Sequence, residues 1–170
     1  MLRATLAWLS SLDSTITISH QNDTKSHYCR STPGLFLQPF IVSQLSGSVI
    51  EQVVEGSDVT ATEFAVTSWL NVVGGATPTE LADRLGLAPT TLSAMIDRLV
   101  RKKQVRRVRH PADGRSYRLE LTAKGKATNA RNGERFARAI ATLRGNLDGD
   151  PDEILDALYR LEAALRRSLE

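Results

Sequence analysis

Apolar residues recur at helical spacing from about Pro39 to the end of the chain. In the first such segment the apolar positions are Phe40, Ile41, Leu45, Val49, Val53 and Val54, and Gly56 follows them. In the second they are Phe64, Ala65, Trp69, Val72 and Val73, and Gly74-Gly75 follows them. Spacings of three and four residues place such positions on one face of a helix, and glycine is typical of a helix end. The pattern therefore predicts two helices.

Two capping boxes predict where helices begin. Thr60 is followed three residues later by Glu63, and Thr77 by Glu80. In such a box the hydroxyl and the carboxylate satisfy the first free backbone N–H groups of a helix. Two boxes within about twenty residues indicate that this region is helical.

The C-terminal part predicts two more helices. Thr122 can cap a long helix that runs to about Leu143, and Asp150-Pro151-Asp152-Glu153 is a strong start for another. On this last helix, apolar residues alternate at spacings of four and three, as in a coiled coil: Ile154, Leu158, Leu161 and Leu165.

The stretch ATPTELADRLGLAPTTLSAMIDRL has the pattern of a helix-turn-helix pair. Such a pair needs a small residue in its first helix and a turn residue that tolerates positive φ, and Ala82 and Gly86 meet these demands. The apolar contacts come from Leu81, Leu85, Leu87, Leu92, Ile96 and Leu99. With the last three facing the core, the outward positions of the second helix are Thr90, Thr91, Ser93, Ala94, Asp97, Arg98 and Arg101.

A short hairpin follows the pair. VRRVR and SYRLELT are separated by HPADGR, whose Asp113-Gly114 is a typical turn, so two strands are predicted. Positive charge is concentrated here: eleven of the 22 Lys and Arg residues lie between Arg98 and Lys126, beside two acids, whereas the chain's net charge is +3. A local excess of this kind is typical of a polyanion-binding surface. We therefore predict a mainly α fold with a small β-hairpin wing, a winged helix-turn-helix that binds double-stranded DNA.

The residue types suggest a role for each candidate contact. Short polar side chains at the start of the recognition helix can approach base edges and phosphates, and the positions there are Thr90, Thr91, Ser93 and Ala94. Backbone contacts are expected from Arg98 and Arg101, and Arg107 and Arg109 of the hairpin are further candidates for binding DNA. Arg115 at the hairpin tip is predicted to enter the minor groove, where negative potential attracts a guanidinium. Asp113 would be repelled by phosphates, so we expect it to pair with a nearby arginine and shape the wing.

From about Thr60 to Lys126 the sequence resembles the multiple-antibiotic-resistance regulator (MarR) family of bacterial winged-helix repressors. ELADRLGLAPTTLSAMIDRL, Arg107, HPADGR and LTAKG stand in the family's order and spacing. The resemblance implies an obligate homodimer through the first and last helices, Thr91 and Ser93 on the recognition helix, and a wing-tip Arg115 braced by Asp113. It also implies promoter repression, often of the regulator's own promoter. Release of DNA by a small aromatic or phenolic effector bound between the two subdomains is a further implication.

Four positions depart from the family pattern. Lys103 stands where the family usually has glycine, and Gln104 where an aliphatic residue is usual. Ala94 occupies a position where arginine is common, and Ala88 replaces a serine cap. The departures bear on operator sequence and affinity rather than on the fold.

The apolar face of the last helix predicts a homodimer, because a monomer would leave it bare; the alternative is that it packs within its own chain. Two recognition helices would then lie in successive major grooves, about 34 Å apart, on a near-palindromic operator. The expected organisation is a flexible extension at residues 1–33, a first dimerisation helix at 34–56, the winged helix-turn-helix at 57–121 and C-terminal dimerisation helices at 122–170.

Sensing is less well specified by the sequence. Phe64 and Trp69 could line a pocket for a small aromatic ligand, although core packing explains both more simply. Cys29 offers a redox-sensing alternative, with His27 able to lower its pKa. It precedes Pro33-Gly34, however, whereas the family's peroxide-sensing branch holds its reactive cysteine within the first helix.

Catalysis, metals and cofactors are not expected. The histidines are His20, His27 and His110, and His27-x-Cys29 lacks the further ligands of a zinc site. Nucleophile elbows, phosphate-binding loops and paired carboxylates are missing from the sequence. One cysteine excludes an internal disulfide and fits a reducing cytosol, and no apolar run reaches the roughly 18–20 residues of a membrane span. We expect a cytoplasmic protein that is not an enzyme and has no membrane partner.

Two other functions stay open. A winged helix can serve as a protein-interaction module, which would show a shallower salt dependence than phosphate binding. The chain could also be a constitutive DNA-binding protein without an effector, and such a protein would show no ligand-dependent release.

Overall fold

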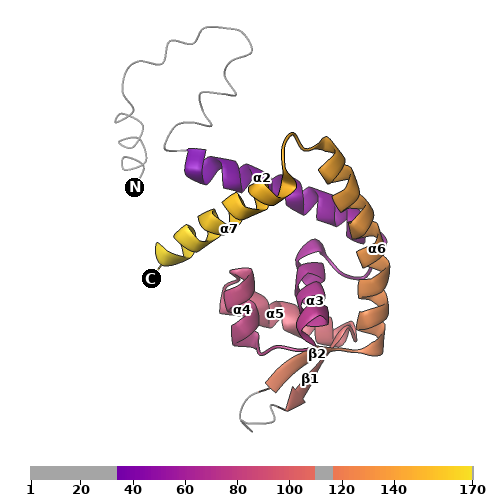
Figure 1. Ribbon diagram of the computed structural model, residues 1–170. Coiled ribbons are helices and arrows are strands. Elements are labelled where there is room, and N and C mark those ends of the chain that lie inside the picture. Colours follow the sequence, from indigo (N-terminus) through magenta and orange to yellow (C-terminus); the bar gives the residue numbers. More distant parts are fainter. Residues whose placement is uncertain (1–33, 110–116, 170) are drawn as a thin grey trace, which may run out of the picture. The chain divides into compact units, whose positions relative to one another are not determined.

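The computed structural model describes residues 34–109 and 117–169. Its elements follow the order α2, α3, α4, α5, β1, β2, α6 and α7 (Figure 1). The chain divides into two compact units, Met1–Ser43 and Gln44–Glu170. The predictions for the 1–33 extension, Cys29, Asp113 and Arg115 concern residues outside the described ranges. The prediction of a mainly helical fold with one small hairpin is confirmed.

Helix α2 (Gly34–Val54) begins upstream of Pro39, which lies inside it. Most of its apolar side chains are exposed, whereas Val53 and Val54 at its C-terminal end are buried in the core of the second unit. The exposed ones include Leu35, Phe36, Leu37, Phe40, Ile41, Val42, Leu45 and Val49. Apolar surface of this extent on one helix is typical of an interaction surface.

Helices α3 and α4 begin and end at the residues that the capping boxes and the glycines predict. Helix α3 (Ala61–Val73) and helix α4 (Pro78–Leu85) each start with a complete capping box, on Thr60 and on Thr77. Gly74 ends α3 with φ 76° and Gly86 ends α4 with φ 62°. Because a Cβ disfavours this left-handed conformation, glycine is the residue that lets each helix stop and the chain turn. Helix α5 (Pro89–Arg101) follows after a short turn.

The wing is an antiparallel pair of strands, β1 (Val105–Arg109) and β2 (Tyr117–Leu121). The register pairs Val105 with Leu121 and Arg107 with Leu119. Ala76, between α3 and α4, adds a bridge to Leu119 on the other edge of β2, with two backbone hydrogen bonds of 2.8 and 3.1 Å. The hairpin is therefore fastened to the start of the helix-turn-helix, and it extends away from the helices in Figure 1.

One hydrophobic core supports α3, α4, α5 and the hairpin. Its most deeply buried apolar side chains are Val66, Leu70, Leu81, Leu92, Ile96, Leu99 and Leu119. Helix α6 (Ala123–Asn146) covers α3, with Phe136 edge-on to Phe64 at a centroid distance of 5.8 Å. The Asn129 amide donates to the Ser68 hydroxyl at 3.0 Å on the same contact. The core therefore fixes the angle between the recognition helix and the wing.

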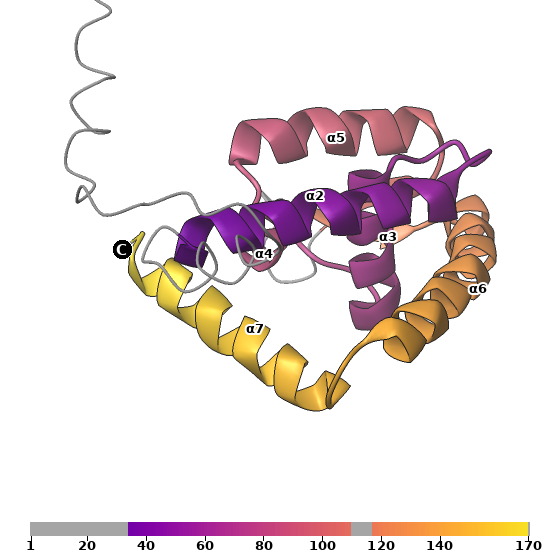
Figure 2. The ribbon, with the colours of Figure 1, turned by 90° about the horizontal axis from the view of Figure 1, so that it is seen from above.

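Helix α6 begins after Thr122, as predicted, and ends at Asn146, three residues beyond the predicted end. The chain then turns sharply into α7 (Pro151–Arg167), which Asp150 caps (Figure 2). None of the residues of α7 is buried. In the described part of the chain, no helix is both long enough and apolar enough to cross a membrane.

Candidate nucleic-acid interface

Helix α5 has one face in the core and one in solvent. Leu92, Ile96 and Leu99 are each 1% exposed, whereas the opposite face is open. The exposed residues on α5 include Thr90, Thr91, Ser93, Ala94, Asp97, Arg98 and Arg101. The first turn carries no side-chain cap, because Ala88 occupies the N-cap position and Pro89 follows it. This end of the helix thus presents short side chains beside a backbone that a ligand can approach.

Arg98 and Lys102 are held by a buried acid. The carboxylate of Glu63 on α3 is fully buried; its Oε1 accepts from Arg98 Nε at 3.2 Å and its Oε2 from Lys102 Nζ at 2.6 Å. Burial raises the pKa of Glu63, but the hydrogen bonds from Lys102, from the Thr60 N–H and from Arg98 outweigh it, and the pKa lies below its ordinary value. The last turn of α5 is therefore anchored to the start of α3.

Arg107 links the wing to the recognition helix. Its Nη2 donates to Oδ1 of Asp97 at 2.6 Å, and its guanidinium lies 5.2 Å from the ring centroid of Tyr117. The hydrogen bond with Asp97 raises the pKa of Arg107 further. Arg107 is predicted from the sequence to contact DNA. In the structure its guanidinium joins β1 to α5.

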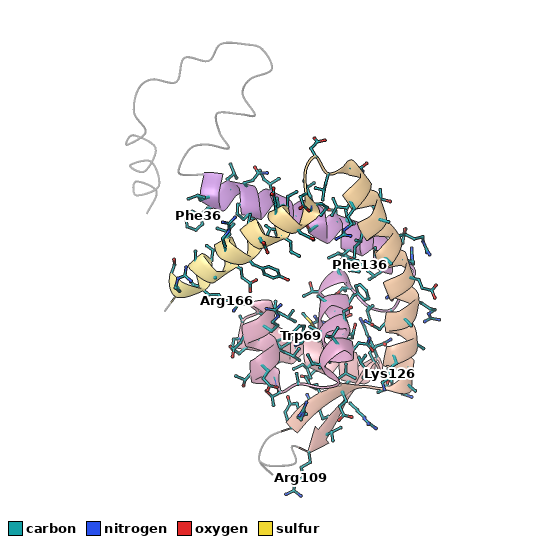
Figure 3. The ribbon with its side chains drawn as sticks, viewed as in Figure 1. Phe36, Trp69, Arg109, Lys126, Phe136 and Arg166 are labelled. Atoms are coloured by element: carbon teal, nitrogen blue, oxygen red, sulfur yellow. The ribbon has the colours of Figure 1, made fainter. Side chains whose placement is uncertain are left out.

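Other cations of the basic region are also engaged within the chain. Arg106 pairs with Glu120 across the hairpin, and Arg118 donates to the carbonyl of Gly75. Lys124 pairs with Asp58 at 2.6 Å, and this hydrogen bond lowers the pKa of Asp58. Within residues 98–109 and 117–126, the cations without an ion pair or a side-chain hydrogen bond are Arg101, Lys103, Arg109 and Lys126 (Figure 3 labels the last two).

The end of α5 has an unusual backbone. Lys103 has φ 58°, and among the described residues other than glycine it alone has a positive φ. The Lys103 N–H donates to the carbonyl of Val100, and the Gln104 N–H to that of Leu99. This is a Schellman motif with lysine at the position that glycine usually takes. A lysine thus occupies a left-handed site, which glycine adopts at a lower cost.

Gln104 is fully buried beside this motif. Its Nε2 donates to Oδ1 of Asp58 at 2.7 Å and to the Thr128 hydroxyl at 3.3 Å. Its Oε1 has no partner in the described part of the chain. A polar side chain thus fills a core position where the family usually has an aliphatic one.

An open groove of about 740 Å³ lies between α3, α4 and α7. Its lining includes Trp69, Arg84, Leu158, Leu161 and Leu165. The guanidinium of Arg84 lies 4.9 Å from the centroid of the Trp69 ring. Phe64 does not join Trp69 there, because its side chain is buried against Phe136 on the α6 side of α3 (Figure 3).

Arg166 of α7 also lines this groove. It donates to the carbonyls of Asp83 and Arg84 at 2.7 and 3.2 Å, and to Oε1 of Glu162. These carbonyls lie at the C-terminal end of α4, where a helix leaves its last acceptors free and favours a cation. Further along α7, the apolar face stays open in the single chain: Ile154 is 37% exposed and Leu158 is 46% exposed.

Comparison with known proteins identifies this arrangement. Residues 59–117 match the model of the MarR family. The HTH-type transcriptional repressor YetL of Bacillus subtilis is 30% identical over 112 residues, which cover 65% of this chain and 67% of that protein. The chain belongs to the MarR family. The multiple antibiotic resistance protein MarR of Salmonella typhimurium is 32% identical over 88 residues, 52% of this chain and 61% of that protein.

Solved MarR-family structures share the fold. A mutant of MarR from Escherichia coli, solved in complex with operator DNA, aligns with a TM-score of 0.68 and 27% identity, covering 81% of this chain and 97% of that one. The regulator BldR from Sulfolobus solfataricus aligns with a TM-score of 0.66 at 20% identity, covering 78% of this chain and 96% of that one, which bears on the fold alone. The chain spans about three fifths of the length of the MarR relatives it matches.

Within this MarR-family fold, sequence reasoning missed the role of Glu63. The capping box accounts for this acid locally, and its partners lie 35 and 39 residues away. Likewise, three lysines of the basic region had no individual role predicted from the sequence and contributed only to its charge: Lys102, Lys103 and Lys126. In the described part of the chain, no cluster of three or more His, Cys, Asp or Glu residues is placed to hold a metal ion.

Proposed function

We propose that this MarR-family chain is a homodimeric regulator that binds double-stranded DNA through α5 and the β1–β2 hairpin. The observation that carries the proposal is the open face of α5, which lies beside unpaired cations of the same basic region. Short residues such as Thr91 and Ser93 are of a size to approach base edges, and Arg101 and Arg109 are free to meet phosphates. The E. coli relative solved with operator DNA supports this function.

Arg98 and Arg107 take a different part in the proposal. Both were candidates for phosphate contacts, yet each is already paired with an acid of its own chain. We assign them to positioning the recognition helix and the wing. The proposed contacts from Thr90, Thr91, Ser93, Ala94, Arg101, Arg109 and Arg115 are kept from the sequence analysis.

The homodimer is supported by apolar side chains that α2 and the first half of α7 leave exposed. The exposed apolar residues on α2 and the face of α7 around Ile154, Leu158, Leu161 and Leu165 would be covered by a second copy. Sedimentation of Ile154→Glu against Arg160→Glu tests this. Dissociation of the dimer by Ile154→Glu but not by Arg160→Glu supports the proposed interface. A wild-type protein that sediments as a monomer contradicts it.

Repression relieved by an effector is the finer part of the proposal. The groove beside Trp69 has an apolar lining and a cation, Arg84, at its rim, which suits a small aromatic compound that carries a phenol or an acid. Phenolic ligands should quench the fluorescence of wild type but not of Trp69→Phe, and should release DNA. Binding of DNA that no such ligand alters would favour a constitutive DNA-binding protein.

The experiment for DNA binding is selection of sites from a pool of random duplexes, followed by sequencing. The proposal expects a near-palindromic site with half-site centres about one helical turn, 34 Å, apart. Testing the selected duplex against the region upstream of the chain's own coding sequence then asks about self-regulation. Enrichment of no sequence would instead favour a protein-interaction module.

A further inference from the structure

We propose that Glu63 limits sequence-independent DNA binding by withholding Arg98 and Lys102 from the phosphate backbone. The inference rests on the proposed DNA-binding function of α5. It concerns a residue that the interface itself would not contain, because Glu63 lies on α3 behind the recognition helix.

One carboxylate, that of Glu63, forms ion pairs with two cations. Both oxygens of the Glu63 carboxylate are used: Oε1 by Arg98 at 3.2 Å, and Oε2 by Lys102 at 2.6 Å and by the Thr60 N–H at 3.0 Å. The carboxylate has no exposed surface, whereas the Arg98 and Lys102 side chains remain 44% and 31% exposed. The cations thus reach inward from a position that is open to solvent.

The two cations paired with Glu63 lie beside a cation that is free to bind phosphate. Arg98 precedes the unpaired Arg101 by three residues, which is nearly one helical turn, and Lys102 follows it directly. All three lie at the C-terminal end of the recognition helix, so a phosphate that Arg101 reaches is close to the other two. With Glu63 ionised, Arg101 is the one free cation among these three.

The balance between carboxylate and phosphate favours the carboxylate. Glu63 is already desolvated and fixed, and two cations that left it would leave a buried charge uncompensated. Each phosphate that a protein neutralises adds affinity for DNA of any sequence and steepens the fall of log affinity with log salt by about 0.9. Two withheld cations therefore lower binding to the excess of competing genomic sites, against which a regulator must find its operator.

Glu63→Gln is the variant that isolates the charge. Glutamine also completes a capping box at this position, so the start of α3 is preserved. The matched control is Glu134→Gln, which removes one negative charge from an exposed residue of α6 that forms no ion pair in the described part of the chain. Both variants change the net charge equally.

The measurement is fluorescence anisotropy of a labelled random-sequence duplex, titrated at a series of salt concentrations. We expect Glu63→Gln to steepen the salt slope by about 1 to 2 for each protomer of the proposed dimer, and to bind at least tenfold more tightly at low salt, with Glu134→Gln close to wild type. Equal slopes for the two variants would overturn the inference. If the wild-type protein binds both this duplex and a selected site, equal slopes for the two variants overturn the inference alone. If the wild-type protein binds no duplex, the proposed function is overturned as well.

A second set of variants does not depend on Glu63→Gln being folded. Arg98→Gln and Lys102→Gln should leave the wild-type salt slope unchanged, because these cations do not reach phosphate. Arg101→Gln should reduce the slope by about 0.9 for each protomer, which is about 1.8 for the proposed dimer. Slopes that fall equally in all three variants would show that Arg98 and Lys102 contact phosphate despite Glu63, and the inference would be wrong.

Discussion

Gly125, in the first turn of α6, packs directly against the main-chain carbonyl of Gln104, so closely that a Cβ at this position would collide with the oxygen. The Gly125 N–H also donates to the Thr122 hydroxyl that caps the helix. This contact joins the start of α6 to the link between the recognition helix and the wing. Its closeness depends on the absence of a side chain.

Gly125→Ala is therefore expected to destabilise the protein by about 3 kcal/mol, because a backbone oxygen cannot move aside as a side chain can. Gly133→Ala on the same helix is the control: a Cβ there meets nothing within 4 Å. Alanine has the higher helix propensity, so this change should stabilise by roughly 0.5–1 kcal/mol. Urea unfolding measures both. Equal effects of the two changes would contradict the packing described.

Lys103→Gly is expected to stabilise the protein. The left-handed backbone of Lys103 costs on the order of 1 kcal/mol of folding free energy, and glycine avoids this cost. Part of the gain is offset because glycine has more conformational entropy to lose from the unfolded chain. We expect a net gain of about 0.5 kcal/mol, or roughly 1–2 °C in Tm for a chain of this size.

The same substitution at Lys126 is the matched control for Lys103→Gly. Lys126 lies inside α6, where glycine should cost about 1 kcal/mol. Calorimetry should give shifts of opposite sign. A loss of stability in both variants would mean that the side chain of Lys103 contributes more than its backbone costs.

Local signals predicted most of the fold. The capping hydroxyls of Thr60 and Thr77, the glycines at 74 and 86 and the Asp113-Gly114 turn signal act over a few residues, so their effects can be predicted from adjacent positions.

Long-range pairing was not predictable in the same way. The sequence does not show that Glu63 takes Arg98 and Lys102, or that Asp97 takes Arg107, because any acid could neutralise any of eleven nearby cations. The structure therefore separates the cations of the basic region into those paired with an acid and those that are unpaired. The net charge of the region does not make this distinction. Trp69 and Phe64 were separated for a similar reason, since both lie on α3 but on different sides.

Asp97→Asn tests whether the link to Arg107 serves the wing. The pair is half exposed, so its loss should change stability by less than about 1 kcal/mol. DNA affinity should nevertheless fall, because the outer part of the wing would lose its side-chain link to α5. Arg107→Gln should weaken binding similarly and keep the wild-type salt slope. A slope reduced by about 0.9 for each protomer in Arg107→Gln would instead identify Arg107 as a phosphate contact.

Acid should weaken the folded state partly through Glu63. Its pKa is lower in the folded chain than the ordinary value of 4.5, so the unfolded chain binds more protons as the pH falls. The stability that Glu63 contributes is present above that ordinary value and is lost as the pH falls through the folded value.

Urea unfolding of wild type and Glu63→Gln between pH 7 and pH 3 measures this contribution. At neutral pH the variant should be less stable by about 1–3 kcal/mol, since it loses charged hydrogen bonds to Arg98 and Lys102. The two curves should converge in acid. A constant difference across the range would show that the carboxylate is not ionised in the folded protein.

The most direct test of DNA binding by α5 and the wing is the affinity of the selected duplex at about 50 and 200 mM salt, for wild type and for Arg101→Gln. For a dimer with six to ten phosphate contacts, the wild-type affinity should fall by about 10³–10⁵ between the two salt concentrations. Arg101→Gln should bind more weakly and lose less affinity to salt. Retention that is insensitive to salt, or identical in the two proteins, would contradict the claim that this face of the molecule binds DNA.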